Sequence, residues 1–146
     1  MRAYRTVLIT ISALVIMVAA SGCLSTVPVT RADIEKLAPQ TVDAAGQAFE
    51  SGDWKLFCEA WAADVPMCQK SIATWRDGGM PPELSSVTFI SEALSENTRR
   101  VTFTGKLRNG EEFSSETELL NPGTGQPRFV DPVFWVPRTI SPAPKS

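Results

Sequence analysis

The sequence predicts an α+β domain in which N-terminal helices pack on a curved antiparallel sheet of about four strands. Two patterns support this class: apolar residues recur at helical spacing over residues 31–75 and alternate with polar residues over residues 87–136. The chain has 146 residues, of which 43% are hydrophobic and 21% charged, as is typical of one globular domain. We therefore expect a single domain at residues 31–136.

Two absences limit the chemistry that the chain can perform. It has no histidine, which removes the commonest general base and the commonest metal ligand. Its only tyrosine is Tyr4. The formal charge is −2 and the sequence has no basic cluster, so nothing indicates nucleic-acid binding. We expect no metal, no cofactor and no nucleic-acid partner.

The N-terminal segment is typical of a signal peptide. Arg2 and Arg5 precede an apolar run from Val7 to Ala20, which is shorter than the roughly 20 residues of a membrane-spanning helix. Small residues then lead to Cys23. This ending resembles the lipobox of bacterial lipoproteins, actinobacterial ones included, although Ala20 stands where leucine is usual.

The resemblance implies cleavage after residue 22 and acylation of Cys23, for instance with palmitate. Each buried methylene adds about 0.8 kcal/mol, so two or three acyl chains give stable anchoring. We thus expect a signal peptide at residues 1–22, a lipidated tether at residues 23–30, and a place on the outer face of the cytoplasmic membrane, or in the outer membrane of a cell with two. The alternative is an ordinary secretory signal cut near Ala20, which would leave Cys23 free.

If Cys23 carries lipid, Cys58 and Cys68 remain as an even pair. An exported chain meets an oxidising compartment, where such a pair indicates a disulfide. The spacing is not C-x-x-C, and two cysteines without histidine do not complete a usual zinc site. The sequence therefore predicts a structural disulfide rather than a reactive or metal-binding pair.

Capping residues mark the helices. Thr30 and Asp33 indicate the start of the first helix, and Pro39 interrupts its apolar pattern, so we expect either a kink or a fresh start there. Gly52 indicates the end of this helix, and Asp53 is a good N-cap for the next. One face of the second helix carries its core anchors, namely Trp54, Phe57, Cys58 and Trp61.

Asp64 and Pro66 indicate a third short helix, which DGGMPP at residues 77–82 ends. Its residues Cys68, Ile72 and Trp75 are expected to point inward. Beyond the domain, residues 137–146 form a proline-rich tail.

Four strands follow from the alternation, at Val87–Leu94, Arg99–Arg108, Glu111–Leu120 and Arg128–Val136. A two-residue Asn109–Gly110 turn would put charged and apolar residues on one face.

A three-residue loop, Arg108 to Gly110, instead pairs Gly105 with Phe113 and Phe103 with Ser115. Gly110 would then be left-handed in a G1 bulge. We therefore predict the three-residue loop.

This order of helices and meander, with the stretch AFESGDWKLFCEAW, resembles small exported lipoproteins of the nuclear transport factor two-like, cystatin-like superfamily. The resemblance covers about residues 31–136, although the family's longer form has a helix between strands that is not predicted here. It implies a cone between sheet and helices, in which the enzymes of the superfamily place Asp, Tyr or His.

The chain offers Glu59 or Asp64 as a lone base, but acidic residues near helix ends are usually caps or solvated. We expect a non-catalytic accessory domain that presents its sheet face or its cone pocket to a protein or a small apolar ligand. An exposed apolar patch on the sheet would favour a protein, and a cavity would favour a ligand. The alternative is an isomerase or dehydratase that uses a buried carboxylate in the cone. The residues expected to line the pocket are Trp54, Trp61, Phe103 and Phe113, and those expected on the solvated sheet face are Thr102, Thr104, Glu116 and Glu118.

Overall fold

The computed structural model describes residues 27–75, 80–123 and 125–136. The predicted signal peptide, Cys23 and the proline-rich tail lie outside these residues, as does part of the DGGMPP stretch. Three helices precede a four-stranded antiparallel sheet with strand order β1-β2-β3-β4. The helices are α1 (Arg31–Ser51), α2 (Trp54–Trp61) and α3 (Val65–Thr74); a short 3-10 turn, η1 (Leu84–Ser86), leads to β1 (Thr88–Ser95), β2 (Thr98–Lys106), β3 (Glu112–Leu120) and β4 (Arg128–Phe129).

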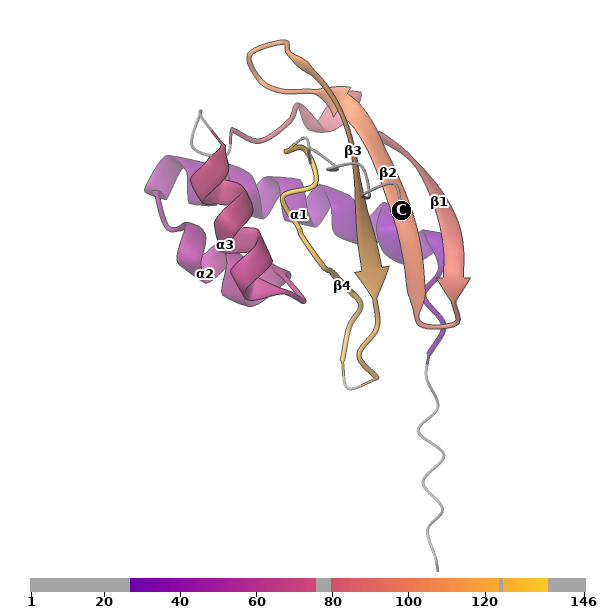
Figure 1. Cartoon of the computed structure of the whole chain (residues 1–146). Coiled ribbons are helices and arrows are strands. Elements are labelled where there is room, and N and C mark those ends of the chain that lie inside the picture. Colours follow the sequence, from indigo (N-terminus) through magenta and orange to yellow (C-terminus); the bar gives the residue numbers. More distant parts are fainter. Residues whose placement is uncertain (1–26, 76–79, 124, 137–146) are drawn as a thin grey trace, which may run out of the picture.

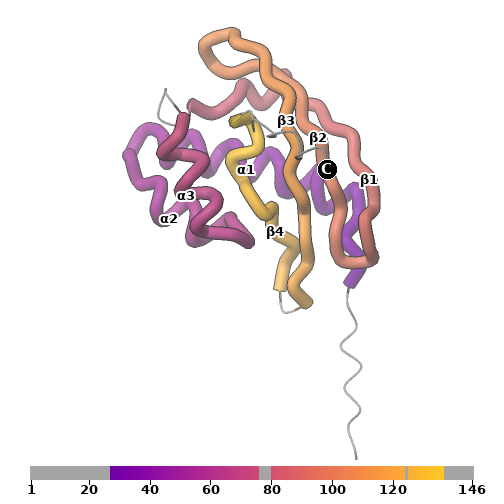
Figure 2. Tube along the Cα trace, in the orientation of Figure 1, coloured from indigo at the N-terminus to yellow at the C-terminus, as the bar shows by residue number. Residues whose placement is uncertain are grey.

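The sheet is curved, and α1 crosses one of its faces while α2 and α3 lie beyond the β4 edge (Figures 1 and 2). The predicted α+β class is therefore confirmed. Residues that alternate along the two central strands point toward α1 and are buried. These are Val101 and Phe103 of β2, Leu107 directly after it, and Phe113, Ser115, Thr117 and Leu119 of β3.

Helix α1 begins at the predicted cap. The Asp33 carboxylate accepts a hydrogen bond from the Thr30 amide at 2.7 Å, and the Asp33 amide donates to Thr30 Oγ1 at 3.4 Å. The helix continues through Pro39, so no fresh start occurs there. Proline costs the helix one backbone donor, but packing outweighs this loss because the helix buries residues on both sides of it. The nearest of these are Leu37, Ala38, Thr41 and Val42.

The hairpin between β2 and β3 has the predicted register. Gly105 lies opposite Phe113, and Phe103 lies opposite Ser115. The Leu107 amide donates to the Glu111 carbonyl at 2.8 Å, which leaves a three-residue loop in which Gly110 has a φ of 86°. The alternation of apolar side chains was sufficient to select this loop over the two-residue turn.

The fourth predicted strand, Arg128–Val136, is wrong in length, because only Arg128 and Phe129 pair with β3. Past them, Thr117 Oγ1 of β3 donates to the Asp131 carbonyl at 3.0 Å and accepts from the Asp131 amide at 3.3 Å. Pro132 follows and has no amide to donate to a ladder. The chain therefore leaves the sheet at Asp131.

Residues 131–136, which we call the C-terminal plug, fill the space between the sheet and the helices (Figure 1). The Phe134 ring stacks on Phe103 of β2, with centroids 3.9 Å apart and planes 19° apart. Phe134 also meets Phe129 and Trp135 edge to face. All six plug residues are buried, so this run has no solvent-facing side and could not have formed a half-exposed strand.

The plug is also tied to its surroundings by hydrogen bonds. The Asp131 carboxylate accepts from Ser71 Oγ of α3 at 2.5 Å and from the Val133 amide at 3.0 Å. With the bonds to Thr117 of β3, Asp131 joins the plug to a helix and to a strand. A buried carboxylate is tolerated here because these donors satisfy it.

The plug makes the fold sensitive to the Phe134 ring. Replacing Phe134 with Ala should lower the free energy of unfolding by about 3–5 kcal/mol, since a large buried ring leaves a cavity. Urea unfolding followed by circular dichroism measures this change. The matched control is Leu56→Ala on the exposed face of α2, where the side chain is 60% exposed and the expected change is within about 0.5 kcal/mol. Equal stability of the two variants would contradict this account of the core.

Candidate functional site

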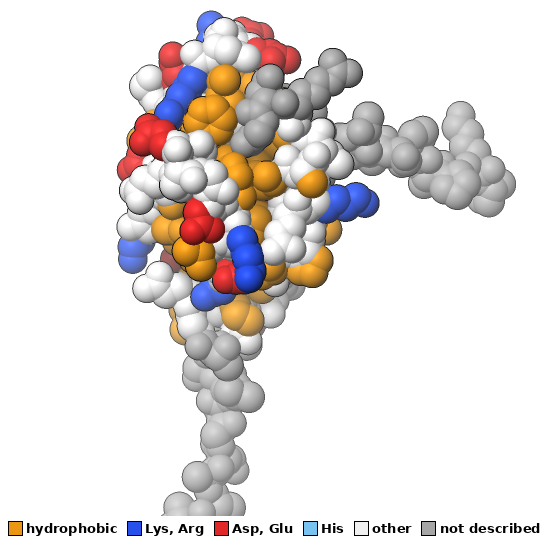
Figure 3. All heavy atoms as spheres, turned by 90° about the vertical axis from the view of Figure 1, so that its left-hand side faces the viewer, with side chains coloured by type: hydrophobic (Ala, Val, Ile, Leu, Met, Phe, Trp, Pro, Cys, Tyr) orange, Lys and Arg blue, Asp and Glu red, His pale blue; other side chains and the backbone are white. Residues whose placement is uncertain are grey.

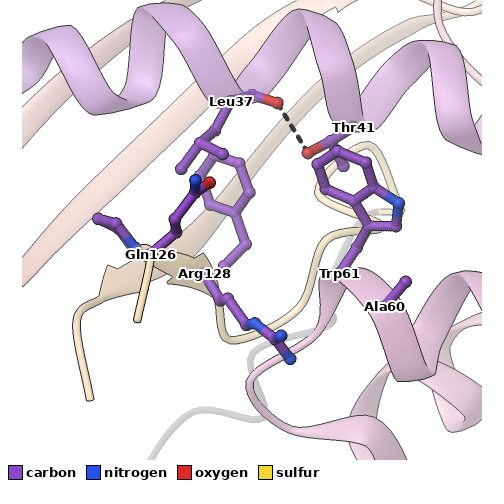
Figure 4. Close-up of a pocket in the computed structure, with 8 residues that line it drawn as sticks. Leu37, Thr41, Ala60, Trp61, Gln126 and Arg128 are labelled. Carbon is purple, nitrogen blue, oxygen red and sulfur yellow. Dashed lines mark hydrogen bonds between the residues drawn. The ribbon is translucent and has the colours of Figure 1, made fainter. Parts of the chain in front are cut away.

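A pocket of about 330 Å³ lies between α1, the end of α2 and the segment that enters β4 (Figure 4). We call it the side pocket. Its volume is at the lower end of the range for small-molecule sites. The lining residues are Leu37 and Thr41 of α1, Ala60 and Trp61 of α2, and Gln126, Pro127, Arg128 and Phe129.

The inner part of the side pocket is apolar. Leu37, Thr41 and Phe129 are buried residues that belong to the packed interior. The Thr41 hydroxyl donates to the Leu37 carbonyl at 2.8 Å, so its hydrogen already forms a bond within α1 and is not directed at a ligand. The half-buried indole of Trp61 stands on one side of the pocket, opposite Leu37 and Gln126 (Figure 4). Such walls suit a flat apolar group.

The outer part of the side pocket is polar. Gln126 and Arg128 are exposed, and Arg128 extends between the two sides of the pocket at its margin (Figure 4). Within the part of the chain that the structure describes, Arg128 forms no ion pair. It is also the one ionisable residue among the eight that line the pocket. The pocket thus combines an apolar floor with a single positive charge at its rim.

The disulfide predicted between Cys58 and Cys68 is present and joins α2 to α3, with both cysteines fully buried. Just beyond α2, the Ala63 amide donates to the Phe129 carbonyl at 2.8 Å. The chain after Trp61 is thereby attached to β4. These two links hold Trp61 beside the residues that enter β4.

The structure does not bring the four predicted pocket residues together. Only Trp61 lines the side pocket. Trp54 is half-buried and packs edge to face on Phe57, with ring centroids 5.4 Å apart. Phe103 is fully buried under the plug, and Phe113 is buried beside Gly105, where a Cβ would lie 2.9 Å from its ring.

The physical reason is the plug, which occupies the space expected to form the pocket. Sequence reasoning assigned residues 131–136 to a strand and so missed Leu37, Phe129 and Arg128 as pocket residues. The available signal was the apolar run Val133 to Val136, which has no polar residue to face solvent.

The candidate bases occupy positions typical of structural residues. The Asp64 carboxylate accepts from the Met67 amide at 2.9 Å and caps α3, and Glu59 is exposed with Lys55 at 3.7 Å. Asp131 is buried, but it binds Ser71 and does not line the side pocket.

The solvated face of the sheet is predominantly polar. Glu116 and Thr104 are exposed, while Thr102 and Glu118 are half-buried. Arg100 lies 3.2 Å from Glu116, and the exposed apolar residues of this face, Ile90 and Leu94, are both on β1. Figure 3 views another side of the molecule, where hydrophobic atoms are interspersed with charged ones. The sheet face therefore does not form a broad apolar patch.

Among the described residues, no helix is long and apolar enough to cross a membrane. The same residues contain no group of three or more His, Cys, Asp or Glu side chains placed to hold a metal ion. Comparison of the chain with protein-family models, curated protein sequences and solved structures gives no match.

Reduction of the disulfide should lower the free energy of unfolding by about 2–3 kcal/mol, the value expected for opening a loop of this size. The measurement is urea unfolding with and without dithiothreitol, with thiol titration to establish reduction. The Cys58→Ala, Cys68→Ala double variant is the control and should not respond to the reductant. An unchanged midpoint in the reduced wild type would show that the link adds nothing to stability.

Proposed function

We propose that this protein is an exported lipoprotein, anchored through acyl chains on Cys23, whose domain binds a small apolar ligand in the side pocket without converting it. The observation that carries the binding part is the pocket itself, with an apolar floor and a polar rim. None of its eight lining residues is an Asp, Glu or Cys. The lining therefore offers no carboxylate or thiol as a general base or nucleophile, and its one hydroxyl, that of Thr41, donates to the Leu37 carbonyl.

The side pocket supports a ligand better than the sheet face supports a protein. The sheet's outer residues are mostly charged or hydroxylated, and its exposed large apolar side chains, Ile90 and Leu94, are both on β1. A protein interface usually has an apolar centre. The packed interior also leaves little room for an enzyme of the isomerase type, because the plug stacks on Phe103 where the cone would hold a substrate.

We also assign the domain to the nuclear transport factor two-like, cystatin-like group. The support is the order of three helices and then a curved meander, in which α1 crosses one sheet face. The proposal of an export signal rests on Arg2, Arg5, the short apolar run and the small residues before Cys23.

Anchoring is tested by metabolic labelling with a clickable fatty acid. The wild type should carry the label and appear in the membrane fraction, because acyl chains supply the anchoring energy. Cys23→Ser should carry none, while Cys58→Ala, Cys68→Ala should be labelled like the wild type. Label retained by Cys23→Ser would remove the lipoprotein proposal.

Ligand binding is tested by equilibrium dialysis of the neutral ring compound 2-naphthamide against the full chain in phosphatidylcholine nanodiscs, with empty nanodiscs as the blank. A dissociation constant at or below about 1 mM is expected for a ligand of this size. Ala60→Trp places an indole at the pocket and should abolish binding. Its matched control is Ala73→Trp, on the exposed face of α3 away from the pocket, which should bind as the wild type does. Equal binding by both variants would place the ligand elsewhere.

A further inference from the structure

We infer that the side pocket selects ligands in which a flat apolar ring carries a carboxylate, and that Arg128 binds this carboxylate. The inference rests on the proposed function, since it names the class of ligand for the same pocket. It starts from the charge at the rim. Arg128 is exposed and lacks an ion-pair partner within the described residues.

Two other arginines, Arg31 and Arg100, are paired with neighbouring carboxylates, whereas the exposed Arg108, like Arg128, has no ion pair within the described residues but does not line the pocket. Arg31 lies 3.0 Å from Glu35 and over the Phe89 ring, and Arg100 lies 3.2 Å from Glu116. Among the described residues, Arg128 has no carboxylate partner, so an incoming anion does not have to displace one of these carboxylates from it. A guanidinium presents a planar fork of N–H donors that matches the two oxygens of a carboxylate.

The backbone on which Arg128 stands is held from two sides. In the sheet, Arg128 lies opposite Leu120 and Phe129 opposite Leu119. On the other side, the Ala63 amide donates to the Phe129 carbonyl, which ties this backbone to the end of α2. The origin of the Arg128 side chain is therefore fixed relative to Trp61, and less ordering is required when a ligand binds.

The apolar lining of the side pocket indicates that the ligand has a flat apolar ring. Trp61 and Phe129 contribute aromatic rings to the lining, and Leu37 contributes an aliphatic side chain. Gln126 adds an uncharged amide at the rim, and no carboxylate lines the pocket to repel an anion. A ring with an amine would instead place its positive charge near Arg128. The arrangement thus favours an aromatic carboxylate over its neutral or cationic counterparts.

The expected difference in affinity between the carboxylate and the neutral ligand comes from one charged hydrogen bond to Arg128, which is exposed to solvent. Such a bond corresponds to about a tenfold gain in affinity, with salt screening part of it.

The test compares 2-naphthoate with 2-naphthamide by equilibrium dialysis against the full chain in zwitterionic phosphatidylcholine nanodiscs. The wild type should bind the carboxylate about tenfold more tightly than the amide. Arg128→Gln should bring the ratio of the two affinities close to one. The matched control is Arg108→Gln, an exposed arginine of the β2–β3 loop that does not line the pocket, and it should keep the ratio.

The possible outcomes separate this inference from the proposed function. If both compounds bind equally and Ala60→Trp blocks both, the pocket binds ligands but Arg128 does not select among them, and the inference fails alone. A ratio that persists in Arg128→Gln also overturns it. If neither compound binds the wild type, the inference and the ligand-binding proposal fail together.

Discussion

The stacking of Phe134 on Phe103 ties the C-terminal end of the fold to the centre of the sheet, with ring centroids 3.9 Å apart. Around this contact, Phe129 and Trp135 meet Phe134 edge to face, so four aromatic rings form a continuous core. The polar bonds of Asp131 to Ser71 and Thr117 set the direction in which the plug enters that core. A curved sheet with helices beyond one edge would otherwise have a hollow interior, and the plug fills it with residues that come last in the domain.

The position of the side pocket is a consequence of this packing. The plug occupies the centre, and the side pocket lies at the margin, where α1, α2 and the entry to β4 meet. The two-residue length of β4 allows Phe129 to serve both the core and the pocket floor, while Arg128 beside it stays at the surface. The disulfide and the Ala63–Phe129 hydrogen bond then hold the helical wall against the strand.

The first described residues, 27–29, are held close to the loop that enters β4. The Asn121 side-chain amide donates to the Val27 carbonyl at 3.2 Å, and the Val29 amide donates to the Glu96 carbonyl at 2.9 Å. The chain that would lead from the membrane anchor is thus bound to the start of the loop between β3 and β4. That loop carries Gln126 at the pocket rim, so under the proposed anchoring the pocket would open near the lipid surface.

The sequence by itself determined the elements whose signals are local. The Thr30, Asp53 and Asp64 caps, the Gly110 turn, and the β2–β3 register all follow from capping chemistry and alternation within short stretches. Only the tertiary structure determined that residues 131–136 form an irregular plug, because a run of apolar residues is equally compatible with a buried strand. It also decided the site: Leu37, Trp61 and Arg128 are far apart in the sequence, and only the packing of the plug leaves space where they meet.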